Sequence, residues 1–384
     1  MLKRILSTTA LIVAVSAPAT WGACCYFAAI GKDVNQPGQK AFISWDERHD
    51  LESFTVQPTF SGTATEFGMV IPTPSRPKLQ EMPRDFFKAL AIFTILEPMD
   101  LSKYKRQMVM YKSSDRMMRD SEGAIPRNAV RVLEHGVVGN LDYKVLEADR
   151  ADALYQWLQE NHYNYGGDKA TLQSYVDKKW NFTTMKIDPR QMKKDASGKF
   201  TGDITPTRFT FGSSRLIYPL HITQLSVKDS TDALFYVMAR EKMDLPGKWS
   251  YEPNFLSMWS QAIGYAVPEK LTEKEKKWKS RLEREQRGRS GSPDGGSLEW
   301  AGVLTRSQLD FLSGDRKFDR DAPPEEAARL KVLQGHLKEG WYLTKMRKSF
   351  SKQEMVSDLE LVPARVGKDP EDLDYTMILP TSPP

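Results

Sequence analysis

The stretch Glu52–Pro77, ESFTVQPTFSGTATEFGMVIPTPSRP, decides how the fold is predicted from this sequence. Apolar side chains stand at every second position in its first run, 54–56, and again in its second run, 67–71. This period of two is typical of β-strands with one buried face, and the polar Gly/Thr residues between the runs are typical of a turn. Prolines follow the second run. Because proline cannot donate to a neighbouring strand, we expect the chain to leave the sheet there or to follow its edge.

A third run with strand character precedes this stretch. It is Gln39–Trp45 (QKAFISW), and the charged residues after it, 46–50, suit a hairpin loop. We therefore expect three strands, 39–45, 54–58 and 67–72, to form an antiparallel meander.

The middle of the chain combines helices with further strands. Apolar residues at helical spacing predict one helix from Asp149 or Arg150 to Glu160 and a second over Lys169–Lys179, with Asp168 as its N-cap. The strands predicted to follow are Trp180–Ile187, Thr205–Phe211, Leu216–Ile222 and Leu234–Ala239. The predicted fold class is α+β: antiparallel β-sheets with an inserted helical hairpin and a C-terminal helix-strand unit.

Changes in composition divide the chain into four parts. Residues 1–23 resemble a signal peptide, and 24–267 contain the α+β core domain. Residues 268–297 combine a densely charged helical pattern with a Gly/Ser linker. The last part, 298–384, contains a helix predicted over 325–337 that leads into a strand.

The N-terminus has the three-part layout of a secretory signal peptide. Lys3 and Arg4 precede the apolar run Ile5–Val15, and small residues follow over 16–19. The run is too short to span a bilayer, and no later stretch reaches the ~18 apolar residues that a membrane helix needs. We expect export to the periplasm or the extracellular space, with no transmembrane helix in the mature chain.

Two adjacent cysteines, Cys24 and Cys25, stand at the expected mature N-terminus. A bridge between neighbouring cysteines strains the peptide bond that joins them, and the chain contains no other cysteine to pair with. Ala23 before Cys24 leaves a lipid anchor open as an alternative, although Trp21 stands where a lipobox needs a small aliphatic residue. The pair is a candidate thiol or lipid-anchor site, and the simpler interpretation gives it no catalytic role.

Compact motifs of common enzyme classes are missing from the sequence. It has no G-x-S-x-G elbow, no phosphate-binding loop and no G-x-G-x-x-G. The five histidines are scattered, without the spacing of metal ligands. His221 lies in the predicted strand 216–222 and is interpreted as a packed or surface residue. We therefore predict no catalytic residue, no cofactor and no metal.

Polar and aromatic side chains gather in the loop after the first predicted helix. They are Asn161, His162, Tyr163, Asn164 and Tyr165. This composition suits contact with a carbohydrate or a peptide, and a well-hydrogen-bonded connection between two helices accounts for it equally. The loop is the candidate binding site of the sequence.

The positive charge is small and mostly dispersed. A formal net charge of +5 and a pI near 8.9 argue against a dedicated nucleic-acid domain, which concentrates its basic residues on one face. The basic segment Lys270–Arg289 also contains glutamates at spacings that favour pairs within a helix. A solvated helix is the main interpretation of this segment, and binding of polyanions is the alternative.

Several separated stretches resemble the bacterial domain of unknown function 2330. They are ACCYF (23–27), FGMVIPTPSRP (67–77), EADRADALYQWLQENHYNYGG (147–167), WNFTTMKID (180–188), TPTRFTFGSSRLIYPLHIT (205–223) and YLTKMRKSFSKQEMVSDLEL (342–361). The resemblance implies an exported protein without an established activity, and it offers no functional residues.

Export and the missing catalytic motifs predict a non-enzymatic envelope or secreted protein with a binding or structural role. Its partner would be an unknown protein or an envelope ligand, and not a specific nucleic acid. One alternative is a thiol- or metal-dependent envelope enzyme that uses Cys24 and Cys25. The other is polyanion binding through the basic helix 270–289.

Overall fold

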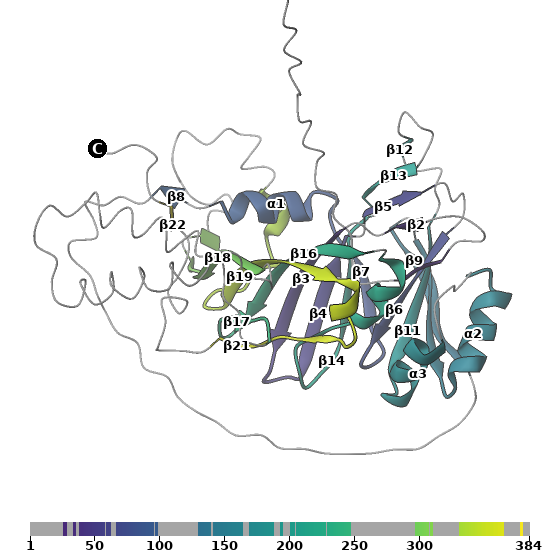
Figure 1. Ribbon diagram of the computed structural model, residues 1–384. Helices are drawn as coiled ribbons and strands as arrows, with labels where there is room; N and C mark the ends of the chain where they lie inside the picture. The colour runs from purple at the N-terminus through teal and green to yellow at the C-terminus, as the bar shows by residue number, and fades with distance from the viewer. Residues whose placement is uncertain are drawn as a thin grey trace, which may run out of the picture.

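The computed structural model describes most of the chain between residues 26 and 378 (Figure 1). The described ranges are 26–28, 34–35, 38–57, 59–62, 67–95, 97–98, 130–139, 141–163, 169–187, 193–194, 200–203, 205–227, 229–246, 296–306, 308–309, 330–364 and 377–378. The two cysteines and the basic segment 270–289 lie outside them.

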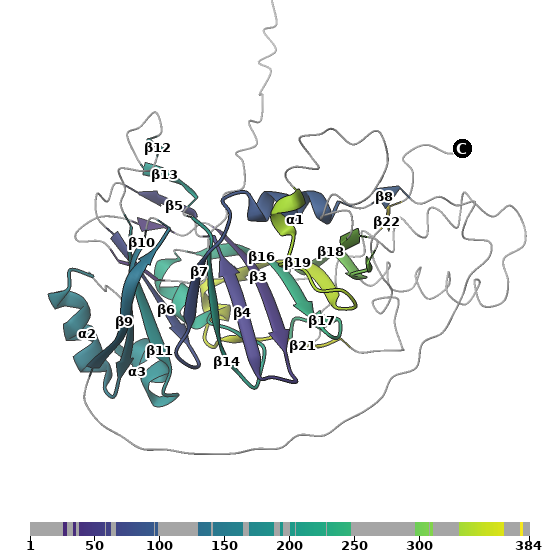
Figure 2. The same cartoon turned by 180° about the vertical axis from the view of Figure 1, so that it is seen from behind.

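Two β-sheets form the body of the protein (Figures 1 and 2). The larger has seven strands in the spatial order β18 (Gly296–Val303), β19 (Tyr342–Ser351), β16 (Ser230–Ala239), β3 (Gly38–Asp46), β4 (Leu51–Val56), β14 (Thr207–Gly212) and β7 (Lys78–Glu81). The smaller has five, in the order β1 (Tyr26–Ala28), β6 (Phe67–Thr73), β11 (Asn181–Ile187), β10 (Leu141–Ala148) and β9 (Val130–Val138).

The main hydrophobic core lies between these two sheets. Phe54 and Phe209 enter it from the larger sheet, and Met69 and Met185 enter it from the smaller one. All four residues are at most 1% exposed. Because complete burial of such a side chain stabilises the fold by about 1.5–3 kcal/mol, this layer holds the sheets together.

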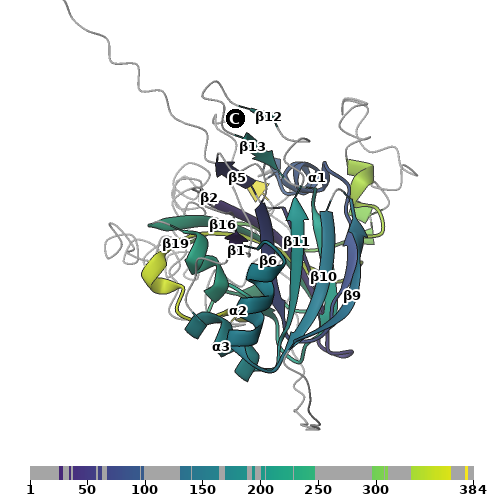
Figure 3. The ribbon, with the colours of Figure 1, turned by 90° about the vertical axis from the view of Figure 1, so that its right-hand side faces the viewer.

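Helices cover both outer faces. α1 (Phe86–Phe93) buries Phe86 and Leu90 against Phe42 and Tyr236 of the larger sheet. α2 (Ala151–Glu160) and α3 (Lys169–Asp177) pack on the outer face of the smaller sheet, as Figure 3 shows. The described residues therefore form four layers, with helices outside and two sheets inside. This arrangement confirms the α+β class, with strands predominant.

The stretch 52–77 connects different sheets, so the predicted meander is wrong. β4 pairs with β3 as expected, but β6 belongs to the five-stranded sheet. Between them, β5 (Thr59–Gly62) pairs in a further sheet with β2 (Val34–Asn35) and β13 (Phe200–Asp203), and β12 (Lys193–Lys194) completes that sheet. The alternating pattern shows only that each strand has one buried face. The buried faces of β4 and β6 contact the same core from opposite sides, so the pattern does not show that the two strands belong to different sheets.

Strand direction also departs from the purely antiparallel prediction. β16 runs parallel to β3, with Phe235 opposite Ala41, so the larger sheet is mixed. Of the helix predicted over 325–337, the structure describes residues 330–337. Leu330 is α-helical there, and the 3₁₀ helix η3 (Lys331–Leu333) follows it. Gly335 follows with φ +77°, a conformation that ends a right-handed helix.

The segment 216–222 is not the continuous strand predicted. Only β15 (Ile217–Tyr218) pairs, with β20 (Leu359–Glu360), and a 3₁₀ helix, η2, begins at His221 and ends at Ser226. Pro219 interrupts the strand because it has no N–H to donate. His221 is therefore the first residue of a short helix and not a strand residue.

A buried carboxyl group supports this irregular segment. Glu52 of β4 is 0% exposed, and its Oε2 accepts the Ile217 N–H at 3.1 Å. Its other oxygen, Oε1, is buried without a hydrogen-bond partner. Burial raises the pKa of Glu52 well above its ordinary value, although the bond from Ile217 opposes this shift. The side chain is therefore held in its protonated form over a wider pH range than a free glutamate.

We predict that Glu52 makes the protein less stable as pH rises. The folded state keeps a proton that the unfolded state releases above the ordinary glutamate pKa of 4.5. Between the two pKa values the free energy of unfolding should fall by about 1.4 kcal/mol per pH unit. Glu52→Gln keeps an oxygen for Ile217 and cannot ionise, so urea unfolding at a series of pH values should show a smaller fall in this variant.

The matched control is Glu81→Gln, which changes an exposed glutamate of β7. It should retain the pH dependence of the unmodified protein. If the free energy of unfolding fell with pH equally in the unmodified protein and in Glu52→Gln, the raised pKa would not belong to Glu52.

Candidate functional site

The predicted loop is largely occupied by structural contacts. Asn161 Nδ2 donates to the Trp157 carbonyl at 3.0 Å, and Asn161 Oδ1 accepts from Lys144 Nζ at 3.1 Å. Tyr163 is only 2% exposed, whereas His162 is exposed and has φ +61°. Asn161 thus caps the C-terminal end of α2, and His162 is the exposed residue of these three. Asn164 and Tyr165, like Cys24 and Cys25, lie outside the described residues.

Tyr163 lies flat between α2 and the smaller sheet. Its ring stacks on Trp157, with centroids 6.1 Å apart and planes at 21°. A Cβ added to Gly68 of β6 would lie 2.5 Å from the Tyr163 ring and 2.9 Å from the Met185 carbonyl oxygen. Only glycine at position 68 therefore leaves room for this ring.

Two lysines cover these rings. Lys144 Nζ lies 5.2 Å from the Trp157 ring centroid, and Lys186 Nζ lies 5.4 Å from that of Tyr163. We name Lys144, Trp157, Tyr163 and Lys186 the Lys–aromatic surface. Within the described part of the chain neither lysine forms an ion pair, although Asp142 stands directly opposite Lys186 in the strand register. An ammonium over an aromatic face gains about 0.5–1 kcal/mol at an exposed site.

Sequence reasoning found the loop and missed these lysines. Lys144 and Lys186 alternate with core residues in β10 and β11, so their strands place them on the same outer sheet face as Leu146 and Phe182. A pattern in the sequence could have located them. In both strands, polar residues continue the apolar sheet face beyond the part that the helices cover.

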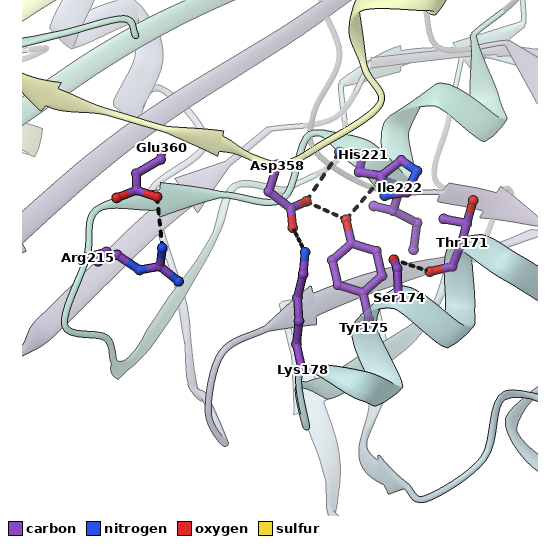
Figure 4. Close-up of polar contacts among 9 residues, drawn as sticks. All are labelled: Thr171, Ser174, Tyr175, Lys178, Arg215, His221, Ile222, Asp358 and Glu360. Carbon is purple, nitrogen blue, oxygen red and sulfur yellow. Dashed lines mark hydrogen bonds and ion pairs between the residues drawn. The ribbon is translucent and has the colours of Figure 1, made fainter. Parts of the chain in front are cut away.

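A second polar group joins three distant parts of the chain (Figure 4). Asp358 accepts hydrogen bonds from the Tyr175 hydroxyl at 2.5 Å, from Lys178 Nζ at 2.8 Å and from the His221 N–H at 3.3 Å. The Tyr175 oxygen in turn accepts the Ile222 N–H at 3.1 Å. We name these five residues the Asp358 junction.

The Asp358 junction has the properties of an anchor. The Asp358 side chain is 3% exposed and accepts three donors, so little of its capacity remains for a ligand. It ties α3 to the start of η2 and to the chain before β20. Beside it, Arg215 and Glu360 form an exposed ion pair at 3.0 Å, a type of contact that contributes about 0–1 kcal/mol.

Metal ligands and membrane-spanning helices are the remaining features of interest. Among the residues that the structure describes, no group of three or more His, Cys, Asp or Glu side chains is placed to hold a metal ion. Nor does that part of the chain contain a helix with the length and apolar character needed to cross a membrane.

The fold and these contacts define an α+β protein built on two packed, mostly antiparallel sheets. The chain belongs to a family of uncharacterized proteins conserved in bacteria, domain of unknown function 2330, whose model matches residues 18–251. No curated protein matches the chain. The crystal structure of baculovirus P35 aligns with 88% of this chain and 99% of its own, at 7% identity and a TM-score of 0.29, which supports no inference.

We predict that Tyr175→Phe destabilises the protein by about 1–3 kcal/mol. The change removes one hydroxyl from a fully buried side chain, which leaves the Ile222 N–H without its acceptor and Asp358 without one donor. Chemical unfolding measures the difference. Arg215→Gln, which breaks only the exposed pair beside the junction, is the control and should cost no more than about 1 kcal/mol. A Tyr175→Phe protein as stable as that control would refute the anchoring role.

Proposed function

We propose that this is an exported, non-enzymatic binding protein of the bacterial envelope or exterior, and that the Lys–aromatic surface contacts an acidic segment of a protein partner. The signal-peptide layout of the N-terminus supports export. The helical hairpin formed by α2 and α3 is, in this proposal, an inserted unit that completes the binding surface of the core domain, 24–267.

The observation that carries the proposal is a pair of oriented lysines that form no ion pair with any residue that the structure describes. Lys144 is held by Trp157 and by the Asn161 side chain, and Lys186 is held by Tyr163. Across β10 and β11 the two lysines are diagonal neighbours, a distance that one extended segment can bridge. Lysines held in place lose less side-chain freedom on binding than free ones do.

The neighbouring residues favour a protein partner. Val137 and His135 of β9 pair with Asp142 and Lys144, so they extend the same sheet face. Val137 is 69% exposed, and His135 is also exposed. An apolar contact beside two cations suits a peptide that carries both acidic and apolar side chains.

We predict that the double variant Lys144→Gln/Lys186→Gln binds a labelled acidic peptide more weakly than the unmodified protein. Each lysine at an exposed site should contribute roughly 2–5-fold in affinity, and added salt should reduce the difference. A peptide of glutamates with interspersed leucines is the probe, and fluorescence anisotropy is the measurement.

Lys88→Gln is the control, because Lys88 is an exposed lysine of α1 that pairs with Asp85. It changes the net charge without touching the Lys–aromatic surface and should bind like the unmodified protein. The control removes one charge and the double variant removes two. A loss of binding free energy in the control that is half of the loss in the double variant would therefore reduce the effect to overall charge. If the protein bound an acidic polysaccharide more strongly than the peptide, the partner would be a polysaccharide and not a protein.

We predict separately that the full-length chain, expressed in a bacterial host, accumulates outside the cytoplasm without its first 19–23 residues, the range of the candidate cleavage sites. Intact-mass spectrometry of the envelope fraction reads the cleavage site and any lipid on Cys24 together. A variant with Leu11→Arg and Val13→Arg, which breaks the apolar run, should stay uncleaved. A full-length mass for the unmodified protein would exclude export by this route.

A further inference from the structure

On the opposite outer face of the protein, the largely buried guanidinium of Arg208 forms no ion pair with the described residues. Arg208 of β14 points away from the main core, toward the layer that contains α1 and η3. Its Nε donates to Thr55 Oγ1 at 3.2 Å and its Nη1 donates to His336 Nδ1 at 3.2 Å. Its Nη2 is fully buried and has no hydrogen-bond partner.

The described residues around Arg208 supply apolar walls and no counter-charge. The guanidinium carbon lies 6.0 Å from the Phe42 ring centroid, and the His336 ring meets the Phe86 ring edge-on at 5.5 Å. Within the described part of the chain Arg208 forms no ion pair with a carboxylate. A largely buried cation without a charged partner is energetically costly.

The guanidinium of Arg208 also fixes the tautomer of His336. Arginine cannot accept a hydrogen bond, so His336 Nδ1 must be the acceptor and its proton must be on Nε2. Burial and the nearby Arg208 charge lower the pKa of His336 to about 4, which keeps the ring neutral at physiological pH. Burial also lowers the pKa of Arg208 to about 10, so the guanidinium remains charged there.

The side chains around this place are only partly buried. Arg208 and His336 are both partly exposed, and Gln80 of β7, which is opposite Arg208 in the register, is exposed and shares its sheet face. The Nη2 atom itself is covered, so an anion reaches it only when a neighbouring side chain moves.

From these contacts we infer that Arg208 forms a binding site for a small oxyanion, a carboxylate or a phosphate group, next to His336. One oxygen of the anion accepts a hydrogen bond from Arg208 Nη2. A charged guanidinium N–H is the kind of donor that binds a carboxylate or a phosphate group. The site lies outside the larger sheet, whereas the Lys–aromatic surface lies outside the smaller one, so the two inferences are independent.

The experiment titrates acetate and inorganic phosphate separately into the full-length protein, with chloride at matched ionic strength as the reference. Binding is read from the side-chain NMR signals of the five histidines. Saturable movement of the His336 signal, with the others still, is the expected result. The anion that saturates first identifies the chemistry. No saturation of the His336 signal with either anion would overturn the inference.

Arg208→Gln should weaken this binding roughly tenfold or more, because it removes a charged donor worth about 1.5–3 kcal/mol. Arg215→Gln, which makes the same charge change at the exposed pair with Glu360, should bind like the unmodified protein. Equal affinity in the two variants would also overturn the inference. If Arg208→Gln does not fold, the His336 titration of the unmodified protein decides alone.

Discussion

The hydrogen bond between the Tyr175 hydroxyl and the Asp358 carboxylate joins residues 183 positions apart in the sequence. It matters because the chain between β14 and β16 turns into η2 there, and two N–H groups at the start of η2 bond to side chains and not to a strand. Tyr175 accepts the N–H of Ile222, and Asp358 accepts that of His221. Without those acceptors the segment would bury unsatisfied donors, and α3 would lose its attachment to the C-terminal part of the chain.

Glu52 performs the same task on the inner side of that segment, but at a different energetic cost. Asp358 receives three donors and is satisfied, whereas the Glu52 carboxyl receives the Ile217 N–H and leaves Oε1 without a partner. A carboxyl group in that position avoids the larger penalty of a buried charge by keeping its proton. The raised pKa of Glu52 therefore links the stability of this part of the fold to pH.

Strands could be predicted from the sequence far better than their partners. The alternations around Phe54 and Met69 correctly indicate buried strand faces, but both faces belong to one core, entered from two sheets. A meander satisfies that pattern as well as a sandwich does. The strand predicted through Pro219 failed because its donors are satisfied by side chains from distant elements. Lys144 and Lys186 could have been found from their alternation, whereas the contact of Arg208 with His336, 128 residues away, has no local signal.

The two proposed sites differ in the physical means by which they hold positive charge. Lys144 and Lys186 lie over aromatic rings at the surface, where mobile ions screen them and an acidic partner competes with water. Arg208 is partly withdrawn between a sheet and its helical cover, with its counter-charge missing from the described chain. Mobile ions screen the charge of Arg208 less at that position. A bound anion gains free energy from attraction and also from accepting the hydrogen bond of an unsatisfied donor. Ionic strength therefore separates the sites: the first should fade as salt increases, and the second should persist until an oxyanion in the salt occupies it.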